Sequence, residues 1–147
     1  MRSRIPFINR AGLIIGTLAL CMTSVMARAE VDVVVSAKNP ITRLSKAQVA
    51  AIFLGNTSRF PDGSQAVPID QIEGAAVRDE FYREFTGKSP AQIKAHWSKI
   101  IFTGRGQPPR EVSSSVELKK LLANNPHAIG YIKPGQVDDG VKVLLVQ

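Results

Sequence analysis

The sequence predicts an α/β fold in which a layer of strands packs against helices. Short runs rich in Val and Ile alternate with segments of helical periodicity in the first half of the chain, as expected of a sheet covered by helices. The 147 residues contain no internal repeat, linker or low-complexity segment. Beyond its first 29 residues, the chain is therefore predicted to form one domain.

The first elements of this domain are two strands with a helix between them. Residues 31–36 are a β-branched run that Lys-Asn-Pro ends, which predicts a strand. Ser45 and Gln48 form a capping-box pattern that begins a helix. A Pro-Asp-Gly turn then leads to a short strand at 66–69, where Pro68 favours the edge of a sheet or the end of a strand. The first helix is predicted to bury Val49, Ile52 and Phe53.

Two further helices follow. Residues 74–85, GAAVRDEFYREF, have apolar side chains at every fourth position, which is typical of a helix with one buried face, and Gly87 ends this helix. The next helix begins with Ser89, Pro90 at its first position and Gln92 as the capping-box partner. The faces predicted to be buried consist of Val77, Phe81 and Phe85 in the earlier helix and Ile93, Trp97, Ile100 and Ile101 in the later one.

The rest of the chain contains a loop, a helix and two strands. Residues 103–110, TGRGQPPR, predict an irregular loop. Ser114 and Glu117 form a cap pattern at the start of a fourth helix, and the β-branched runs at 128–132 and 141–146 predict the last strands. The buried face of this helix is predicted to contain Leu118, Leu121 and Leu122.

The first 29 residues have the organisation of a secretory signal peptide. Three arginines precede the apolar run AGLIIGTLALCMTSVM, and the segment ends in Ala-Arg-Ala. We therefore expect cleavage after Ala29 and a periplasmic or secreted domain of residues 30–147. The apolar run is shorter than the ~18 residues of a spanning helix. An uncleaved N-terminal anchor is the alternative, and the bulky Leu20 disfavours lipidation of Cys21.

The charge of the mature domain differs from that of the whole chain. The signal segment holds four of the 19 basic residues and none of the 12 acidic ones, so the net charge falls from +7 to +3 on cleavage. Cleavage also removes Cys21, the only cysteine, which leaves no disulfide or thiol chemistry. No basic run interleaved with aromatic residues is present, so nucleic-acid binding is not predicted.

The side-chain inventory indicates no catalytic or metal site. The two histidines, His96 and His127, are isolated, and no spacing typical of metal ligands occurs. Residues 113–115, SSS, stand at a helix start rather than in a nucleophile elbow. Glu80 and Glu84 are four residues apart on one helix, as on a solvated face. The sequence therefore predicts neither an enzyme nor a cofactor.

Two other features are candidate ligand contacts. Trp97 and Phe102 could stack on a ligand, but helical spacing predicts that Trp97 is part of the core. The loop at 103–110 contains Arg105 between two glycines, a pattern that lets a backbone and a guanidinium approach an anion. The alternative for this loop is a mobile turn with surface arginines, because Pro108-Pro109 already explains the break.

Three segments resemble the phosphate-binding proteins of ABC-type phosphate uptake systems. They are LSKAQVAAIFLGN, RDEFYREFTG and NPHAIGYIKPG, and they occur in the same order as in that family. The resemblance runs from about residue 33 to the end of the chain. It implies one lobe of a type II periplasmic-binding-protein-like fold, with a mixed sheet flanked by helices.

The family's phosphate motif is altered in this sequence. The family pattern reads roughly Arg-x-x-Gly-Ser-Gly-Thr-Arg-x-x-Phe, in which the arginine, the hydroxyls and the helix-start amides hold phosphate. Gly74, Arg78 and Phe81 are kept, whereas Gln71, Ala75, Ala76 and Val77 replace the arginine, serine, glycine and threonine. The resemblance thus implies weak anion binding, mainly through the backbone of Gly74, Ala75, Ala76 and Val77, with Gln71, Arg78 and Arg105 as further candidate contacts.

Three functions remain open from the sequence. The favoured one is an exported, non-enzymatic solute-binding-like module that binds phosphate or another small anion weakly. The second is a structural or protein-interaction module, in which a protein partner or a second copy replaces the missing lobe. The third is an enzyme that would use Ser114 or His127, which the sequence disfavours.

Overall fold

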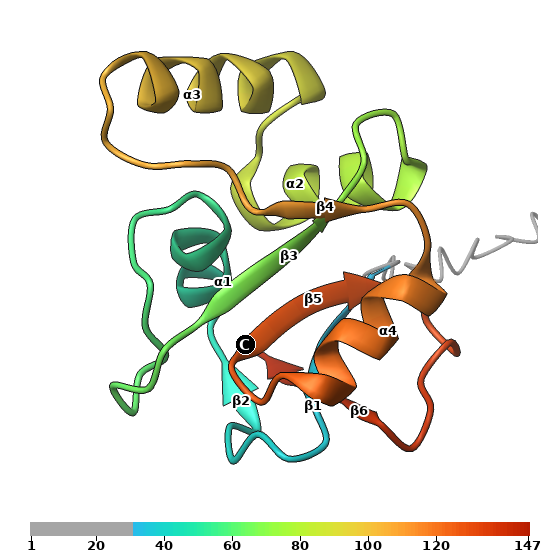
Figure 1. Cartoon of the computed structure of the whole chain (residues 1–147). Coiled ribbons are helices and arrows are strands. Elements are labelled where there is room, and N and C mark those ends of the chain that lie inside the picture. Colours follow the sequence, from blue (N-terminus) through green and yellow to red (C-terminus); the bar gives the residue numbers. More distant parts are fainter. Residues whose placement is uncertain (1–30) are drawn as a thin grey trace, which may run out of the picture.

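The computed structural model describes residues 31–147, so the predicted signal peptide and its cleavage site lie outside the described residues. The described chain is a mixed α/β domain, as predicted (Figure 1). Its elements are β1 Asp32–Ser36, β2 Arg43–Leu44, α1 Lys46–Phe53, β3 Val67–Gln71, α2 Ala76–Thr86, α3 Pro90–Phe102, β4 Arg110–Val112, α4 Ser115–Asn124, β5 Ala128–Ile132, β6 Val141–Val143 and β7 Leu145–Val146.

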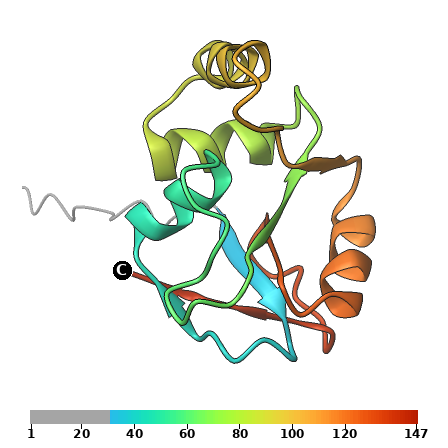
Figure 2. The ribbon, with the colours of Figure 1, turned by 60° about the vertical axis from the view of Figure 1, so that its left-hand side comes forward.

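The main sheet has five strands in the order β4-β3-β5-β1-β6. β3 runs parallel to β4 and β5, whereas β1 is antiparallel to both β5 and β6. β2 and β7 form a separate parallel pair. Helices α1 and α2 lie on one face of the main sheet and α4 lies on the other (Figure 2).

Each face of the sheet has its own apolar core. Successive residues of a strand point to opposite faces, so Val33 and Val35 pack with α1, α2 and α3, while Val34 packs with α4. Phe81 of α2 stacks on Tyr131 of β5, with ring centroids 4.0 Å apart. Aromatic packing therefore joins α2 to the sheet.

The predicted helix caps are confirmed for α1, α2 and α3, and for α4 in the serine half of its pattern. α1 and α3 each begin with a complete capping box, Ser45 with Gln48 and Ser89 with Gln92. The Ser114 side chain accepts a hydrogen bond from the Glu117 N–H at the start of α4. Gly87 ends α2 with φ of +68°, a conformation that glycine adopts without a steric penalty.

The predicted buried face of α3 is partly wrong. Ile93 and Trp97 are buried, but Ile101 is 56% exposed. α3 lies above α2 rather than on the sheet (Figure 1), so it has a neighbour along only one narrow stripe. Phe102, at the end of the helix, is 93% exposed. Similarly, Leu118 and Leu122 of α4 are fully buried, whereas Leu121 is only partly so.

One strand prediction is confirmed and two need correction. Pro68 stands near the start of β3, at a strand end as predicted, where β5 is its only neighbour because β4 pairs only with Ile69 and the two residues after it. The predicted loop at 103–110 ends inside β4, whose other two residues, Glu111 and Val112, fall in no predicted element. The last predicted strand, 141–146, is divided because Leu144 still donates to Val33 of β1, whereas Leu145 donates to Thr42 beside β2.

Candidate functional site

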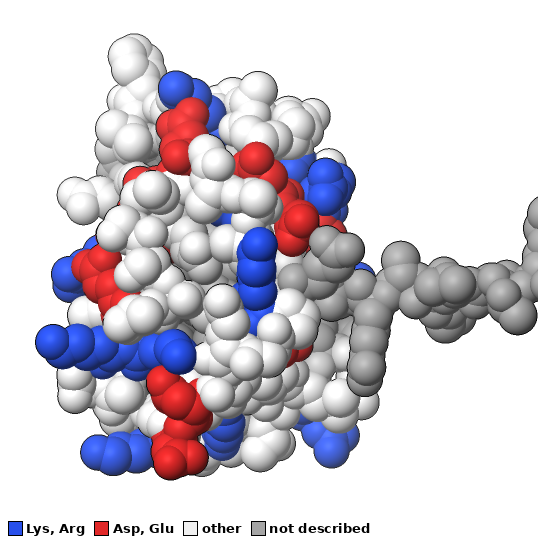
Figure 3. All heavy atoms as spheres, turned by 90° about the vertical axis from the view of Figure 1, so that its right-hand side faces the viewer, with Lys and Arg blue, Asp and Glu red and all other residues white. Residues whose placement is uncertain are grey.

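The candidate site lies where β3, β4 and β5 end. These parallel strands share one carboxyl edge, and ligands of open α/β sheets bind at such edges. Residues 72–75 connect the end of β3 to α2 at this edge. The edge forms the right-hand side of Figure 1, which faces the viewer in Figure 3. That face carries both acidic and basic side chains rather than one continuous basic patch (Figure 3).

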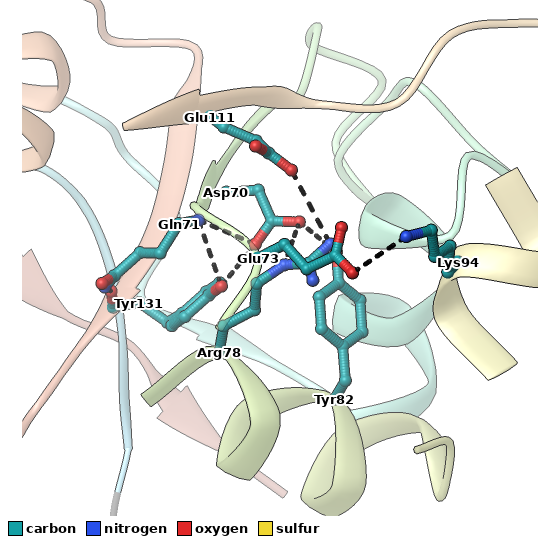
Figure 4. Close-up of polar contacts among 8 residues, drawn as sticks. All are labelled: Asp70, Gln71, Glu73, Arg78, Tyr82, Lys94, Glu111 and Tyr131. Carbon is teal, nitrogen blue, oxygen red and sulfur yellow. Dashed lines mark hydrogen bonds and ion pairs between the residues drawn. The ribbon is translucent and has the colours of Figure 1, made fainter. Parts of the chain in front are cut away.

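A buried carboxylate, Asp70, is the centre of the site (Figure 4). It is 1% exposed and accepts four hydrogen bonds. The Tyr82 hydroxyl donates to Oδ2 at 2.6 Å, and the Tyr131 hydroxyl donates to Oδ1. The backbone N–H of Gln71 donates to Oδ1 at 2.8 Å, and Nε of Arg78 donates to Oδ2 at 3.4 Å. These donors replace the water that the carboxylate loses on burial.

Arg78 extends from the first turn of α2 into this cluster. Its side chain is 8% exposed and lies between two carboxylates: Asp70 of β3, whose Oδ2 is 3.4 Å from Nε, and Glu111 of β4, whose Oε1 is 3.8 Å from Nη2. The guanidinium carbon is also 5.3 Å from the centroid of the Tyr82 ring, which favours a cation. Burial alone would lower the pKa of Arg78, but the charge of Asp70, the electrostatic effect of Tyr82 and Tyr131 and the hydrogen bond to Asp70 together outweigh burial, so the pKa is raised.

Both tyrosines of the cluster are held protonated. Burial raises the pKa of Tyr82 and of Tyr131 far above their ordinary values, and the negative charge of Asp70 and their hydrogen bonds to it raise them further. A phenolate beside Asp70 would place two negative charges in a buried space. The tyrosines therefore act as hydrogen-bond donors that fix the carboxylate.

The start of α2 has no side-chain cap. Ala75 occupies the N-cap position, where its methyl group cannot accept a hydrogen bond. The N–H groups of Arg78 and Asp79 donate to the Ala75 carbonyl oxygen at 3.0 and 3.2 Å. Within the described chain, the N–H groups of Ala76 and Val77 are left without a helical acceptor. Gly74, with φ of +91°, turns the chain into this helix start.

The predicted site residues are only partly brought together. Gly74 to Val77 form the start of α2, and Gln71 and Arg78 lie beside it. The Gln71 side chain, however, donates from Nε2 to the Tyr131 carbonyl oxygen at 3.0 Å, and Arg78 is paired with Asp70. Arg105 follows the far end of α3, whereas Lys94 near the beginning of α3 reaches the site by pairing with Glu73 at 3.3 Å. The anion contacts proposed for these residues stay predictions.

Sequence reasoning missed the polar residues that organise the site. They are Asp70, Glu73, Tyr82, Lys94, Glu111 and Tyr131. Asp70 directly follows the strand predicted at 66–69, and β3 continues through it to Gln71; a carboxylate next to an apolar strand run is the signal that could have found it. Glu111 gave no such signal, because it falls between the predicted loop at 103–110 and the predicted fourth helix, where no strand was expected.

The residues weighed for catalysis, metal binding or stacking have structural contacts. Ser114, a catalytic alternative, caps α4, and His127, the other, is exposed, with its backbone N–H bonded to Asn125 Oδ1. The His96 ring contacts the Leu54 carbonyl oxygen at 2.9 Å, and Trp97 is in the core. Among the described residues, no cluster of three His, Cys, Asp or Glu side chains is placed to hold a metal ion. The same part of the chain contains no helix of the length and apolarity needed to cross a membrane.

A second surface feature is a groove of about 510 Å³. It lies beside the N-terminal end of β1 and is bounded by α2 and the C-terminal residues. Its walls are mainly apolar, and Asp32, Lys46 and Glu84 add charges of both signs. The lining residues are Val31, Asp32, Val33, Lys46, Glu84, Phe85, Pro134, Leu144, Leu145 and Val146.

Comparison with known proteins finds relatives by structure alone. No family model and no curated protein matches the sequence. A solved protein from Clostridium perfringens, assigned as a phosphate ABC transporter substrate-binding protein and containing bound phosphate, is similar with a TM-score of 0.62 and 23% identity. An ABC-type phosphate transport receptor from Vibrio cholerae gives 0.61 and 21%, and PstS from Borrelia burgdorferi gives 0.59 and 17%.

These similarities cover 80% of this chain but only 44%, 46% and 47% of the three solved chains. This chain thus spans less than half the length of each. Its elements, a mixed sheet with helices on both faces, correspond to a lobe of those proteins. The described domain has the fold of one lobe of a phosphate ABC transporter substrate-binding protein.

Proposed function

We propose that this chain is an exported, non-enzymatic solute-binding-like module related to the phosphate ABC transporter substrate-binding proteins, with the phosphate-binding side chains largely replaced. Phosphate or another small anion would bind weakly, at the backbone N–H groups that begin α2. The fold and the predicted signal peptide support this role. The residues that bind the anion would be Gly74, Ala75, Ala76 and Val77.

The observation that carries the proposal is that the side-chain donors beside the start of α2 already bond or face other groups of the protein. The guanidinium of Arg78 faces Asp70 and Glu111, and the amide of Gln71 is bonded to the backbone of β5. A phosphate ion would have to replace these partners to gain the same donors. Each donor withheld from a buried anion costs on the order of 1–3 kcal/mol, and each 1.4 kcal/mol is about tenfold in affinity.

A thermal-shift titration of the purified exported protein with phosphate, sulfate and small organic acids tests the proposal. A ligand at about one hundred times its Kd adds roughly 2.7 kcal/mol, which raises the Tm of a domain of this size by several degrees. We expect such shifts only at millimolar anion. A shift at micromolar phosphate would show that Arg78 and Gln71 leave their internal partners, and would overturn weak binding.

A matched variant identifies the binding groups. Ala76 is the first helical residue of α2, a position where proline is tolerated, and Pro90 occupies the corresponding position of α3. Ala76→Pro removes one candidate amide donor while keeping the helix, so it should abolish the anion-dependent shift. An unchanged shift in this variant would place the anion elsewhere.

The mass of the exported protein tests the localisation, since cleavage after Ala29 leaves Glu30 as the first residue.

The second candidate function is a module that pairs with a second copy of this chain. The apolar groove favours it, and the chain spans less than half the length of its structural relatives. Asp32, Lys46 and Glu84 give the groove charges of both signs, so two copies related by a two-fold axis can match opposite charges. Leu145, on the groove wall, is 56% exposed.

Light scattering after size-exclusion chromatography distinguishes this candidate. A dimer that becomes monomeric in Leu145→Glu, but not in Val116→Glu, would support pairing through the groove. Val116 is a suitable control because it is 71% exposed on α4, outside the groove. A monomeric wild-type protein at all concentrations tested would exclude pairing of two copies.

A further inference from the structure

The strand register brings two carboxylates to the same side of Arg78. Asp70 of β3 and Glu111 of β4 are directly paired residues of parallel neighbours, so their side chains emerge on the same face of the sheet. Like charges in this arrangement repel each other. Arg78 relieves the repulsion, because its Nε faces Asp70 at 3.4 Å and its Nη2 faces Glu111 at 3.8 Å (Figure 4).

The two carboxylates differ in how firmly they are held. Asp70 is fixed by four donors and its side chain is 2% exposed. The Glu111 side chain is 43% exposed, and its 3.8 Å contact with Arg78 is longer than a direct hydrogen bond. Among the described residues, Arg78 is its one ion-pair partner. Glu111 therefore covers the solvent-facing side of the guanidinium without being anchored there.

The charges around the start of α2 do not favour an anion. Asp70 and Glu111 together exceed the single charge of Arg78, and Glu73 nearby is matched by Lys94. A divalent phosphate approaching the N–H groups of Ala76 and Val77 meets this excess negative charge. Replacing Glu111 by a neutral residue of the same size would leave Arg78 with one carboxylate and remove the negative charge that competes with an external anion for its outer side.

We propose that Glu111 limits the affinity of this site for divalent inorganic anions such as phosphate and sulfate, because its carboxylate occupies the outer face of the Arg78 guanidinium. The inference rests on the proposed anion site at the start of α2. It assigns to Glu111 the place on Arg78 that an external anion would otherwise take. Weak anion binding is then a consequence of an internal competitor as well as of the lost hydroxyl donors.

The test compares Glu111→Gln with Asp139→Asn in the exported protein. Both variants remove one negative charge, but Asp139 is exposed in the loop before β6, at the opposite end of β1 from the site. Inorganic phosphate is titrated into each protein, and the backbone signals of Ala76 and Val77 and the Nε–H signal of Arg78 are followed by NMR.

Glu111→Gln should bind phosphate about tenfold more tightly than wild type, because one repulsive charge is removed and one cation is uncovered. The Arg78 Nε–H signal should shift during its titration, and the gain should shrink in high salt. Asp139→Asn should bind like wild type. Equal affinities in Glu111→Gln and Asp139→Asn would overturn the role of Glu111.

Failure of the proposed function has a different signature. In one outcome, phosphate shifts no signal of Ala76 or Val77 in wild type but shifts both signals in Glu111→Gln. Glu111 then prevents phosphate binding in the wild-type protein, and the proposed weak binding by wild type is wrong. If both proteins bind phosphate elsewhere, the amide site and the role of Glu111 are both wrong. Circular dichroism and the Tm confirm that each variant is folded.

Discussion

The starts of α1 and α3 differ from the start of α2 in how they are held. α1 and α3 begin on the surface with complete capping boxes, in which serine and glutamine side chains bond the first backbone amides. α2 begins with Ala75, which cannot bond them. Its first and second turns are held instead from the buried side, where Arg78 and Tyr82 reach Asp70.

The difference matters because a side-chain cap has two effects, and only one of them is present at the start of α2. A capping side chain fixes the helix start and also uses up its amide donors. Anchoring α2 through Asp70 fixes the helix while the Ala76 and Val77 amides stay open. The start of α2 is therefore positioned by the fold while its first two amides have no acceptor within the helix, and this is where we propose that an anion binds.

The largest effect is expected from Asp70→Asn, which breaks the buried anchor. It leaves Arg78 without its buried partner, and removing one member of a buried ion pair costs about 3 kcal/mol or more. The free energy of unfolding, measured with urea, should fall by that amount. Asp139→Asn is the control and should change it by less than about 0.5 kcal/mol. A fall no larger than in the control would show that Asp70 does not anchor α2.

The second effect concerns alkaline pH. The pKa of Tyr82 and of Tyr131 is raised in the folded protein, whereas tyrosines of the unfolded chain lose their protons at about pH 10. The contribution of the two protonated tyrosines to the free energy of unfolding is therefore fully present below about pH 10. Above that pH it falls by about 1.4 kcal/mol per pH unit for each tyrosine.

Urea unfolding at increasing pH measures this loss of stability. The chain has only two tyrosines, so all tyrosinate absorbance reports this cluster and should appear together with unfolding. Tyr82→Phe should remove one tyrosine's share of the pH dependence. Tyrosinate forming near pH 10 in a protein that stays folded would contradict the buried network.

The third effect concerns the capped helices. Ser45→Ala and Ser89→Ala each remove the hydrogen bond to the third backbone amide of α1 or α3. Each change should lower the free energy of unfolding by about 1 kcal/mol, and neither should alter phosphate binding. A change in phosphate affinity in either variant would contradict the assignment of the anion to α2.

The smallest effect is a gain of stability in Ala75→Ser. The backbone of Ala75 already has N-cap geometry, with φ of −70° and ψ of 127°, so a serine there can bond the amides of α2. The free energy of unfolding should rise by about 0.5–1 kcal/mol. No gain would show that the start of α2 differs from the starts of α1 and α3 in more than its missing side chain.

Short-range patterns in the sequence were sufficient to predict most of the helices and strands. The capping boxes, Gly87 and the four-residue spacing of Val77, Phe81 and Phe85 predicted the helices, because these signals act within a few residues of the chain. The short strand β4 had no such signal. It is a strand because β3 lies beside it, and a partner distant in the sequence is not visible in a three-residue segment.

By itself, the sequence determined the α/β class, the positions of the helices and the absence of a side-chain cap on α2. Only the tertiary structure decided that Arg78 faces Asp70 and Glu111 instead of solvent. The physical reason is that burial sets the cost of an unpaired charge. The partners of Arg78 come from β3 and β4, and the register of those strands places them side by side.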